Sequence, residues 1–113
     1  MHEYALVESL LGRVAAEARA RHAIAVHRLK VRVGELSGVD PQLLQTAYDT
    51  VRNGTICAGA DLEVEHEPAS WSCSSCATGL GIGAPLQCPQ CGEPAQLSAG
   101  ADIMLTRIEL EVP

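Results

Sequence analysis

Four cysteines form two Cys-x-x-Cys pairs, Cys73/Cys76 and Cys88/Cys91. A turn that carries two thiolates at this spacing presents both sulfur atoms to one point, so two such turns can supply the four ligands of a tetrahedral metal site. The spacer between the pairs, residues 77–87, contains three glycines and a proline. That composition suits a hairpin that brings the pairs together. The sequence therefore predicts a structural four-cysteine site, with zinc as the preferred ion.

Other uses of these cysteines compete with the zinc interpretation. Two disulfides are less favoured, because no signal peptide opens the chain and we expect a cytoplasmic protein that keeps its thiols reduced. A redox dithiol needs only one pair, and the flanks do not have the pattern of a strand leading into a helix. An iron centre of the rubredoxin kind uses the same ligands, so the sequence does not exclude it. The fifth cysteine, Cys57, lies outside both pairs, and we interpret it as a small buried hydrophobic residue.

The N-terminus carries a second set of metal donors. The terminal amine of Met1, the following amide nitrogen and the His2 ring can chelate one ion, with the carboxylate of Glu3 close by. Nitrogen donors in this arrangement suit a square-planar Ni(II) or Cu(II) ion, because zinc prefers a tetrahedron. From the residues alone the alternative stays open that His2 is a solvated residue at a disordered terminus.

Composition limits the fold and the partners. The chain has 113 residues, of which 47% are hydrophobic and 3% aromatic, with no phenylalanine. We therefore expect a small aliphatic core and a lobe that depends on its metal to fold. Eight basic against fourteen acidic residues give a formal charge of −6, which opposes nucleic acid as a partner. No apolar run reaches the length of a membrane span, so we expect no membrane partner.

Two helices are predicted by apolar periodicity and by capping residues. Residues 4–21 carry one apolar stripe at helical spacing, made of Leu6, Val7, Leu10, Leu11, Val14 and Ala18. A second helix begins at Asp40-Pro41, where a capping carboxylate precedes a residue that needs no N–H in the first turn. Leu44, Ala47 and Val51 line this second helix, and Asn53-Gly54 ends it.

Three segments alternate with a period of two and predict strands. Residues 24–33 alternate apolar with basic side chains, whereas residues 61–67 and 108–112 alternate apolar with acidic ones. Opposite charges directly across a ladder are favourable, so we expect the basic strand to lie between the two acidic strands. A solvated charged face explains the same pattern without any pairing.

The fold class follows from the order of these elements. We predict an α+β fold in which a small three-stranded sheet carries two helices on one face, with a zinc-ribbon-like four-cysteine lobe inserted. Residues 1–67 together with 102–113 form the first domain, and residues 68–101 form the zinc-binding domain. The lobe is thus joined to the sheet at both ends.

The whole chain resembles the HypA/HybF family of hydrogenase nickel-incorporation proteins. The likeness is carried by the N-terminal Met-His-Glu, by residues 33–41, 53–55 and 59–65, by the paired Cys-x-x-Cys motifs and by the terminal strand 108–112. It implies a metallochaperone that delivers Ni(II) to the large subunit of a NiFe hydrogenase, together with a HypB-type GTPase. Urease maturation as a second client stays open. The resemblance also implies nickel binding by His2 with Glu3 beside it, in the first domain, and structural zinc on the four cysteines.

Three further expectations complete this interpretation. Asp40 is a candidate oxygen ligand or outer partner of the nickel site, although its role as a helix cap is sufficient by itself. We expect no enzyme, because the chain has no nucleophile elbow or phosphate loop and the four-cysteine set leaves no open metal position. A nucleic-acid-binding zinc ribbon is disfavoured, since residues 68–100 contain no Lys or Arg and only Trp71 as an aromatic.

Overall fold

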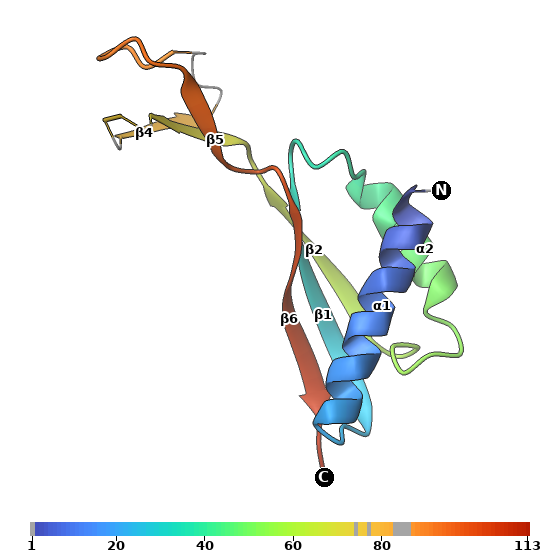
Figure 1. Cartoon of the computed structure of the whole chain (residues 1–113). Helices are drawn as coiled ribbons and strands as arrows, with labels where there is room; N and C mark the ends of the chain where they lie inside the picture. Colours follow the sequence, from blue (N-terminus) through green and yellow to red (C-terminus); the bar gives the residue numbers. More distant parts are fainter. Residues whose placement is uncertain (1, 74, 77, 83–86) are drawn as a thin grey trace.

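The computed structural model describes residues 2–73, 75–76, 78–82 and 87–113, and shows an elongated molecule of 55 × 30 × 16 Å. One sheet with two helices forms the larger part, and a second sheet extends from its end (Figure 1). The elements in chain order are α1 (His2–Ala20), β1 (Ala25–Gly34), α2 (Pro41–Val51), β2 (Asp61–Glu67), β3 (Ser70–Cys73), β4 (Thr78–Ile82), β5 (Ala95–Ala99) and β6 (Ile103–Glu111).

The larger sheet has the strand order β2-β1-β6, which confirms that the basic strand lies between the two acidic ones. β1 runs parallel to β2 and antiparallel to β6. The parallel pairing follows from the connection, because α2 lies between β1 and β2 and returns the chain to the end where β1 began. The last strand begins at Ile103, earlier than the predicted segment 108–112.

Ion pairs on the face of this sheet opposite the helices link β1 to β2. Lys30 lies 2.9 Å and Arg32 3.1 Å from the Glu65 carboxylate, and Arg32 also lies 3.7 Å from Glu67. The hydrogen bonds from Lys30 and Arg32 lower the pKa of Glu65. Charge matching is incomplete toward β6, because Lys30 is opposite Arg107. Exposed pairs of this kind add little stability, so they help to specify strand order more than they hold the fold together.

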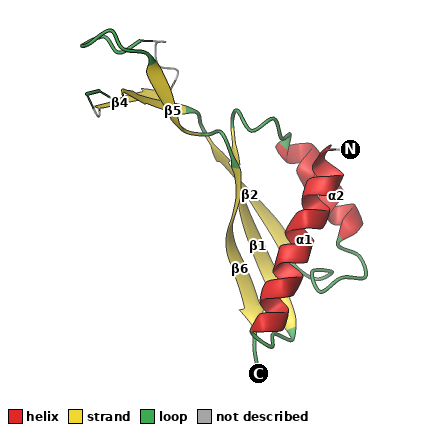
Figure 2. Ribbon diagram, viewed as in Figure 1, coloured by secondary structure: helices red, strands yellow, loops and turns green. Residues whose placement is uncertain are grey.

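Both helices cover the same face of the sheet (Figure 2). α1 runs from His2 to Ala20, slightly earlier than the predicted 4–21, and buries Val7, Leu10, Leu11, Val14 and Ala18 as expected from its stripe. His22 ends it with φ 56°, a left-handed conformation that closes the last turn. α2 ends at Val51, shortly before the predicted stop at Asn53-Gly54, and Gly54 has φ 79°.

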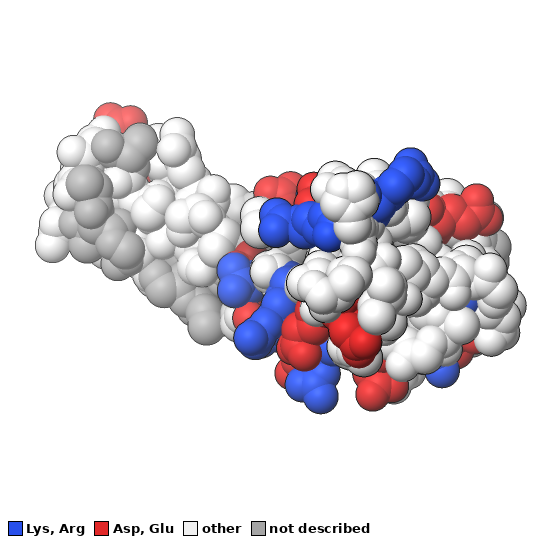
Figure 3. All heavy atoms as spheres, turned by 90° about the horizontal axis from the view of Figure 1, so that it is seen from below, with Lys and Arg blue, Asp and Glu red and all other residues white. Residues whose placement is uncertain are grey.

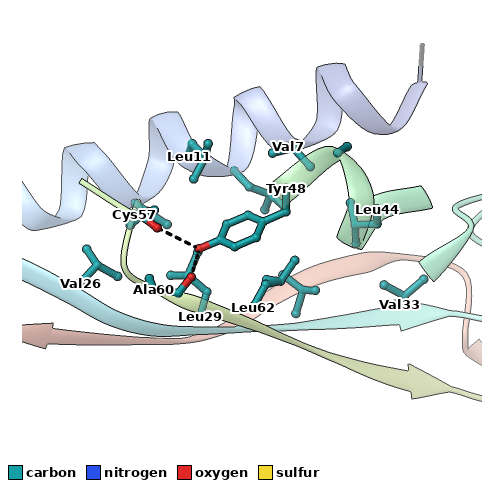
Figure 4. Close-up of a cluster of buried hydrophobic side chains, with 14 residues drawn as sticks. Val7, Leu11, Val26, Leu29, Val33, Leu44, Tyr48, Cys57, Ala60 and Leu62 are labelled. Atoms are coloured by element: carbon teal, nitrogen blue, oxygen red, sulfur yellow. Dashed lines mark hydrogen bonds between the residues drawn. The ribbon is translucent and has the colours of Figure 1, made fainter. Parts of the chain in front are cut away.

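The expectation of a purely aliphatic core is wrong at one position, Tyr48. This side chain is 2% exposed and is the largest of the fully buried ones (Figure 4). Its hydroxyl donates to the carbonyl of Ala60 at 2.7 Å and lies 3.4 Å from the carbonyl of Cys57. Burial raises the pKa of Tyr48 to about 12. Cys57 itself is fully buried, which confirms its interpretation as a core residue, and burial raises the pKa of its thiol.

The second sheet, of order β4-β3-β5, is joined to the first by a closely packed crossing. The carboxylate of Glu35 accepts from the amide of Ala69 at 2.9 Å, and that of Glu67 accepts from the amide of Gly100 at 3.0 Å. A Cβ on Gly100 would lie 2.6 Å from the Cα of Ala69, and one on Gly34 would lie 2.4 Å from the carbonyl carbon of Gly100. Only glycine fits at these two points. The division into two domains at residues 68–101 stays a prediction.

Candidate metal centres

The four cysteines of the paired motifs come from two turns at the end of the second sheet. Cys73 is the last residue of β3, and Cys76 follows it in the turn that leads to β4. Cys88 and Cys91 lie in the turn before β5, where the amide of Gly92 donates to the carbonyl of Cys88 at 2.8 Å. The amide of Cys88 in turn donates to the carbonyl of Glu93 at 2.8 Å. Each pair therefore has its own local backbone support.

The sulfur atoms of these cysteines converge. All four Sγ atoms of Cys73, Cys76, Cys88 and Cys91 lie within 4.8 Å of one another. The Sγ atoms of Cys73 and Cys91 are 3.4 Å apart, and the amide of Cys76 donates to the Cys73 sulfur at 3.4 Å. Four thiolates about 2.3 Å from one zinc ion in a tetrahedron are separated by about 3.8 Å, so the cluster fits a structural zinc site.

Hydrogen bonding within the cluster shifts the pKa values of Cys88 and Cys76 in opposite directions. Hydrogen bonds from the backbone of Cys91 and then of Gln90 lower the pKa of Cys88 to about 7. The pKa of Cys76 rises to about 12, first because of its hydrogen bond with Cys91 and then because of Cys73. A cation that binds here must displace the remaining protons.

The pairs meet in a different way from the predicted hairpin. β4 lies inside the spacer and pairs with β3, and β5 pairs with the other edge of β3. The two turns meet because β4 and β5 both pair with β3. The glycines of the spacer do not indicate this strand order. Residues 83–86 of the spacer lie outside the described part of the chain.

The predicted nickel residues lie at the start of α1 and the start of α2. Met1 and the His2 side chain fall outside the described part of the structure, and the helix begins at His2. Glu3 is 8% exposed, and its carboxylate is 3.5 Å from the backbone amide of Asp40, which donates to it. The structure therefore brings two of the four predicted residues together, from positions far apart in the sequence.

The Asp40 carboxylate caps α2, as the sequence predicts. Its Oδ1 atom accepts from the amides of Gln42 at 2.8 Å and Leu43 at 3.3 Å. Within the described part of the chain, no hydrogen bond is recorded for its other oxygen, Oδ2. Asp40 thus holds the first turn of α2 through Oδ1.

Comparison with known proteins assigns the chain to a family. The family model described as "Hydrogenase/urease nickel incorporation, metallochaperone, hypA" matches residues 1–110. This chain belongs to the HypA family. The resemblance predicted from its motifs is thereby confirmed, and so is the predicted α+β class with its four-cysteine lobe.

Individual HypA proteins match along nearly their whole length. The hydrogenase maturation factor HypA of Aquifex aeolicus is 37% identical over 99% of both chains, and that of Shewanella baltica is 34% identical over 98% of this chain and 97% of its own. The solution structure of the Ni metallochaperone HypA from Helicobacter pylori superposes with a TM-score of 0.74 at 25% identity, covering 98% of each chain. A second HypA solution structure gives a TM-score of 0.81 at 27% identity, over 97% of this chain and 96% of that one.

HypA proteins are nickel metallochaperones of hydrogenase maturation, and this chain has the fold and the four-cysteine cluster of that family. Neither helix in the described part of the chain has both the length and the apolarity that a bilayer span requires. The contact between Glu3 and Asp40 is the feature that sequence reasoning missed. The sequence showed an acidic residue at the start of α1, but neither its burial nor its partner follows from the pattern.

Proposed function

We propose that this chain carries one Ni(II) ion at its N-terminus, held by the terminal amine of Met1, the following amide nitrogen and the His2 ring, with Glu3 and Asp40 as carboxylates beside the ion. The observation that supports this proposal is the contact of the Asp40 amide with the Glu3 carboxylate, because it links two of the proposed residues and Glu3 directly follows His2 in α1. Carboxylates there compensate part of the charge of a divalent cation. They also lie close to the N-terminus of α2, which is fixed in place by the Asp40 cap.

Release of the ion follows from the same donors. An amine, an amide nitrogen and an imidazole must all lose or lack protons to bind, so affinity falls as pH falls or as a partner competes for the donors. A site at the chain terminus can be approached from outside, as transfer to another protein requires. The role proposed is transport, without a catalysed reaction on the chain.

The four cysteines Cys73, Cys76, Cys88 and Cys91 would hold the zinc ion. Bound there, zinc supplies a closed tetrahedral crosslink between the two turns that flank β3. The cluster lies in the second sheet, which has no buried aromatic residue among those described and so depends on the crosslink for its stability. Zinc and nickel then have separate sites and separate roles.

The partners proposed are a HypB-type GTPase and the large subunit of a NiFe hydrogenase, with urease maturation proteins as a further client, all in the cytoplasm. Family membership supports participation in hydrogenase maturation. The absence of Lys and Arg from residues 68–100 supports a protein partner for the zinc lobe rather than a nucleic acid. Figure 3 shows one face, on which basic and acidic side chains are mixed over the larger part.

The test is calorimetric titration of Ni(II) into zinc-loaded protein, with His2→Ala beside His66→Ala as the matched control. His66 is an exposed histidine on β2, away from the proposed site in the sequence. We expect about one nickel per chain in the native protein and in His66→Ala, and loss of that binding in His2→Ala with zinc content unchanged by elemental analysis. Equal nickel binding by His2→Ala and the native chain would remove the N-terminal site from the proposal.

A further inference from the structure

β6 forms one edge of the larger sheet. Because the strand order is β2-β1-β6, one side of β6 pairs with β1 and the other side has no strand partner among the described residues. An unpaired edge presents a row of backbone N–H and C=O groups that can accept an additional strand. The unpaired edge extends over the nine residues Ile103–Glu111.

The apolar face of β6 is covered less completely than that of β1. Leu29, Val31 and Val33 of β1 are at most 1% exposed under the helices. The corresponding apolar side chains of β6 are only partly buried, namely Ile103, Leu105, Ile108 and Leu110. Farther along the chain, Val112 is 54% exposed. The helices therefore leave room beside the outer strand.

That room forms a groove of about 560 Å³ between α1 and β6. Leu105, Ile108, Leu110 and Val112 supply its apolar lining, and the α1 side contributes Arg13, Glu17 and Arg21 at four-residue spacing. Arg21 pairs with Glu17 at 3.3 Å, whereas no ion pair is recorded for Arg13 within the described part of the chain. Arg107 of β6 also lines the groove. Arg107 in turn lies 3.6 Å from Glu109, so three arginines are opposed by two glutamates and the groove is locally basic on a chain of formal charge −6.

We infer that this groove is a docking site for an extended segment of a partner protein, which adds as a strand to the free edge of β6. Apolar side chains of that segment pack against Leu110 and its neighbours under α1. Carboxylates of the segment pair with Arg13 and Arg21. The charge of the groove selects an acidic segment, and the strand edge selects an extended one. This surface is separate from the proposed nickel residues, which lie at the opposite end of α1.

The probe is a labelled peptide of the same length as β6, with threonine alternating with valine and with a glutamate at each end. Its inward face is apolar with acidic ends, as the groove requires. Binding to the zinc-loaded full chain is followed by fluorescence anisotropy at low salt. We expect saturable binding that weakens about tenfold in the double variant Arg13→Glu/Arg21→Glu. A peptide with lysine at both ends should bind at least about tenfold more weakly than the acidic one.

The matched control is Arg19→Glu, an exposed arginine on the same helix that does not line the groove. It changes the net charge in the same direction and should leave binding within about twofold of the native chain. Circular dichroism confirms that each variant is folded. Hydrogen exchange should show new protection of β6 amides when the acidic peptide is bound, because a docked strand pairs with them.

Several outcomes overturn the proposal. Equal binding of the acidic and the lysine peptide would show that the arginines do not favour an acidic segment over a basic one. Binding without new protection in β6 places the peptide elsewhere. Concentration-dependent dimers of the native chain with protected β6 amides, measured by analytical ultracentrifugation, would assign this edge to a second copy instead. None of these results depends on nickel binding, so they leave the function proposed above to its own test.

Discussion

The backbone amide of Asp40 donates to the buried carboxylate of Glu3 at 3.5 Å, which ties the first turn of α1 to the residue that caps α2. The start of each helix is therefore fixed relative to the other. The proposed nickel donors begin at the N-terminus of α1, and loss of the Glu3 carboxylate should affect both helix ends.

Glu3→Gln removes the negative charge of this side chain but keeps an oxygen that can accept the same hydrogen bond. The amide oxygen of glutamine still accepts from Asp40, so we expect an unfolding free energy within about 0.5 kcal/mol of the native value. Loss of the negative charge should weaken nickel binding about tenfold, measured by calorimetry. Glu8→Gln, at an exposed position of α1, is the control and should change neither quantity. Unchanged nickel affinity in Glu3→Gln would limit Glu3 to a structural role.

Two substitutions at Asp40 distinguish capping from metal binding. Asparagine caps helices as well as aspartate, so Asp40→Asn should keep the stability of α2 and lose the charge of Oδ2. Asp40→Ala should cost about 1 kcal/mol in urea unfolding because the amides of Gln42 and Leu43 lose their acceptor. Both variants should bind nickel more weakly. If Asp40→Asn binds nickel like the native chain, Asp40 acts only as a helix cap.

Cys57 and the clustered cysteines should behave differently toward metal and toward thiol reagents. Cys91→Ser removes one of the four converging sulfurs and should abolish stoichiometric zinc, measured by elemental analysis. Cys57→Ala should retain one zinc per chain and lose about 1 kcal/mol of stability from the cavity it leaves. In the native protein the buried Cys57 thiol, whose pKa is raised, should react with a thiol reagent only on unfolding. Rapid reaction of Cys57 in the folded protein would contradict its burial.

Tyr48 predicts a loss of stability at alkaline pH. Its pKa in the folded chain is about 12, above the ordinary value of 10.0, because the buried phenol resists ionisation. The corresponding stabilisation is therefore complete below pH 10.0 and is lost as pH rises toward 12, a change of about 3 kcal/mol. Urea unfolding at several alkaline pH values should show this decline in the native chain.

Tyr48→Phe should remove the part of that decline that Tyr48 causes, and leave the part due to the raised pKa of the Cys57 thiol. At neutral pH the variant loses the hydrogen bond to Ala60, which costs about 1 kcal/mol, but the carbonyl of Ala60 still accepts from Arg52 at 2.8 Å. Tyr4→Phe is the control and should keep the alkaline decline. A parallel decline in Tyr48→Phe and the native chain would show that another group causes it.

The crossing between the sheets predicts an intolerant glycine. Gly100 has φ 94°, and a Cβ there would lie 2.6 Å from the Cα of Ala69, so Gly100→Ala should destabilise by at least about 2 kcal/mol. Gly12 is an exposed helical glycine with nothing within 4 Å of an added Cβ. Gly12→Ala should stabilise the chain by up to about 1 kcal/mol. Thermal unfolding of the two variants should move in opposite directions, and a tolerated Gly100→Ala would mean that the crossing can relax.

Local patterns were enough to predict most of the larger sheet and its helices. The alternation of Leu29, Val31 and Val33 with basic residues located β1, and opposite charge placed it between the acidic strands. Asp40 and Pro41 located the start of α2 because a cap acts within one turn. These features depend on neighbours in the sequence, which is why periodicity and capping rules find them.

Features that depend on distant contacts were not predicted. The burial of Tyr48 depends on the carbonyl of Ala60 in another segment, and the position of Glu3 depends on the amide of Asp40. The sharing of β3 between β4 and β5 likewise depends on pairing across the spacer. The cysteine spacing predicted that four sulfurs would converge, but it did not contain the strand order that brings them together.

The crossing at Ala69 and Gly100 also affects how the chain can fold. β6 must join β1 after an excursion through the whole cysteine lobe, which as a flexible loop would carry an entropic cost of closure. Once the lobe is folded, its two ends lie in contact, and the effective loop between β2 and β6 shrinks to a few residues. The free-energy cost of closing this loop falls by about 2 kcal/mol, because the closure entropy grows with the logarithm of loop length. A metal bound far from the larger sheet thereby favours the addition of that sheet's last strand.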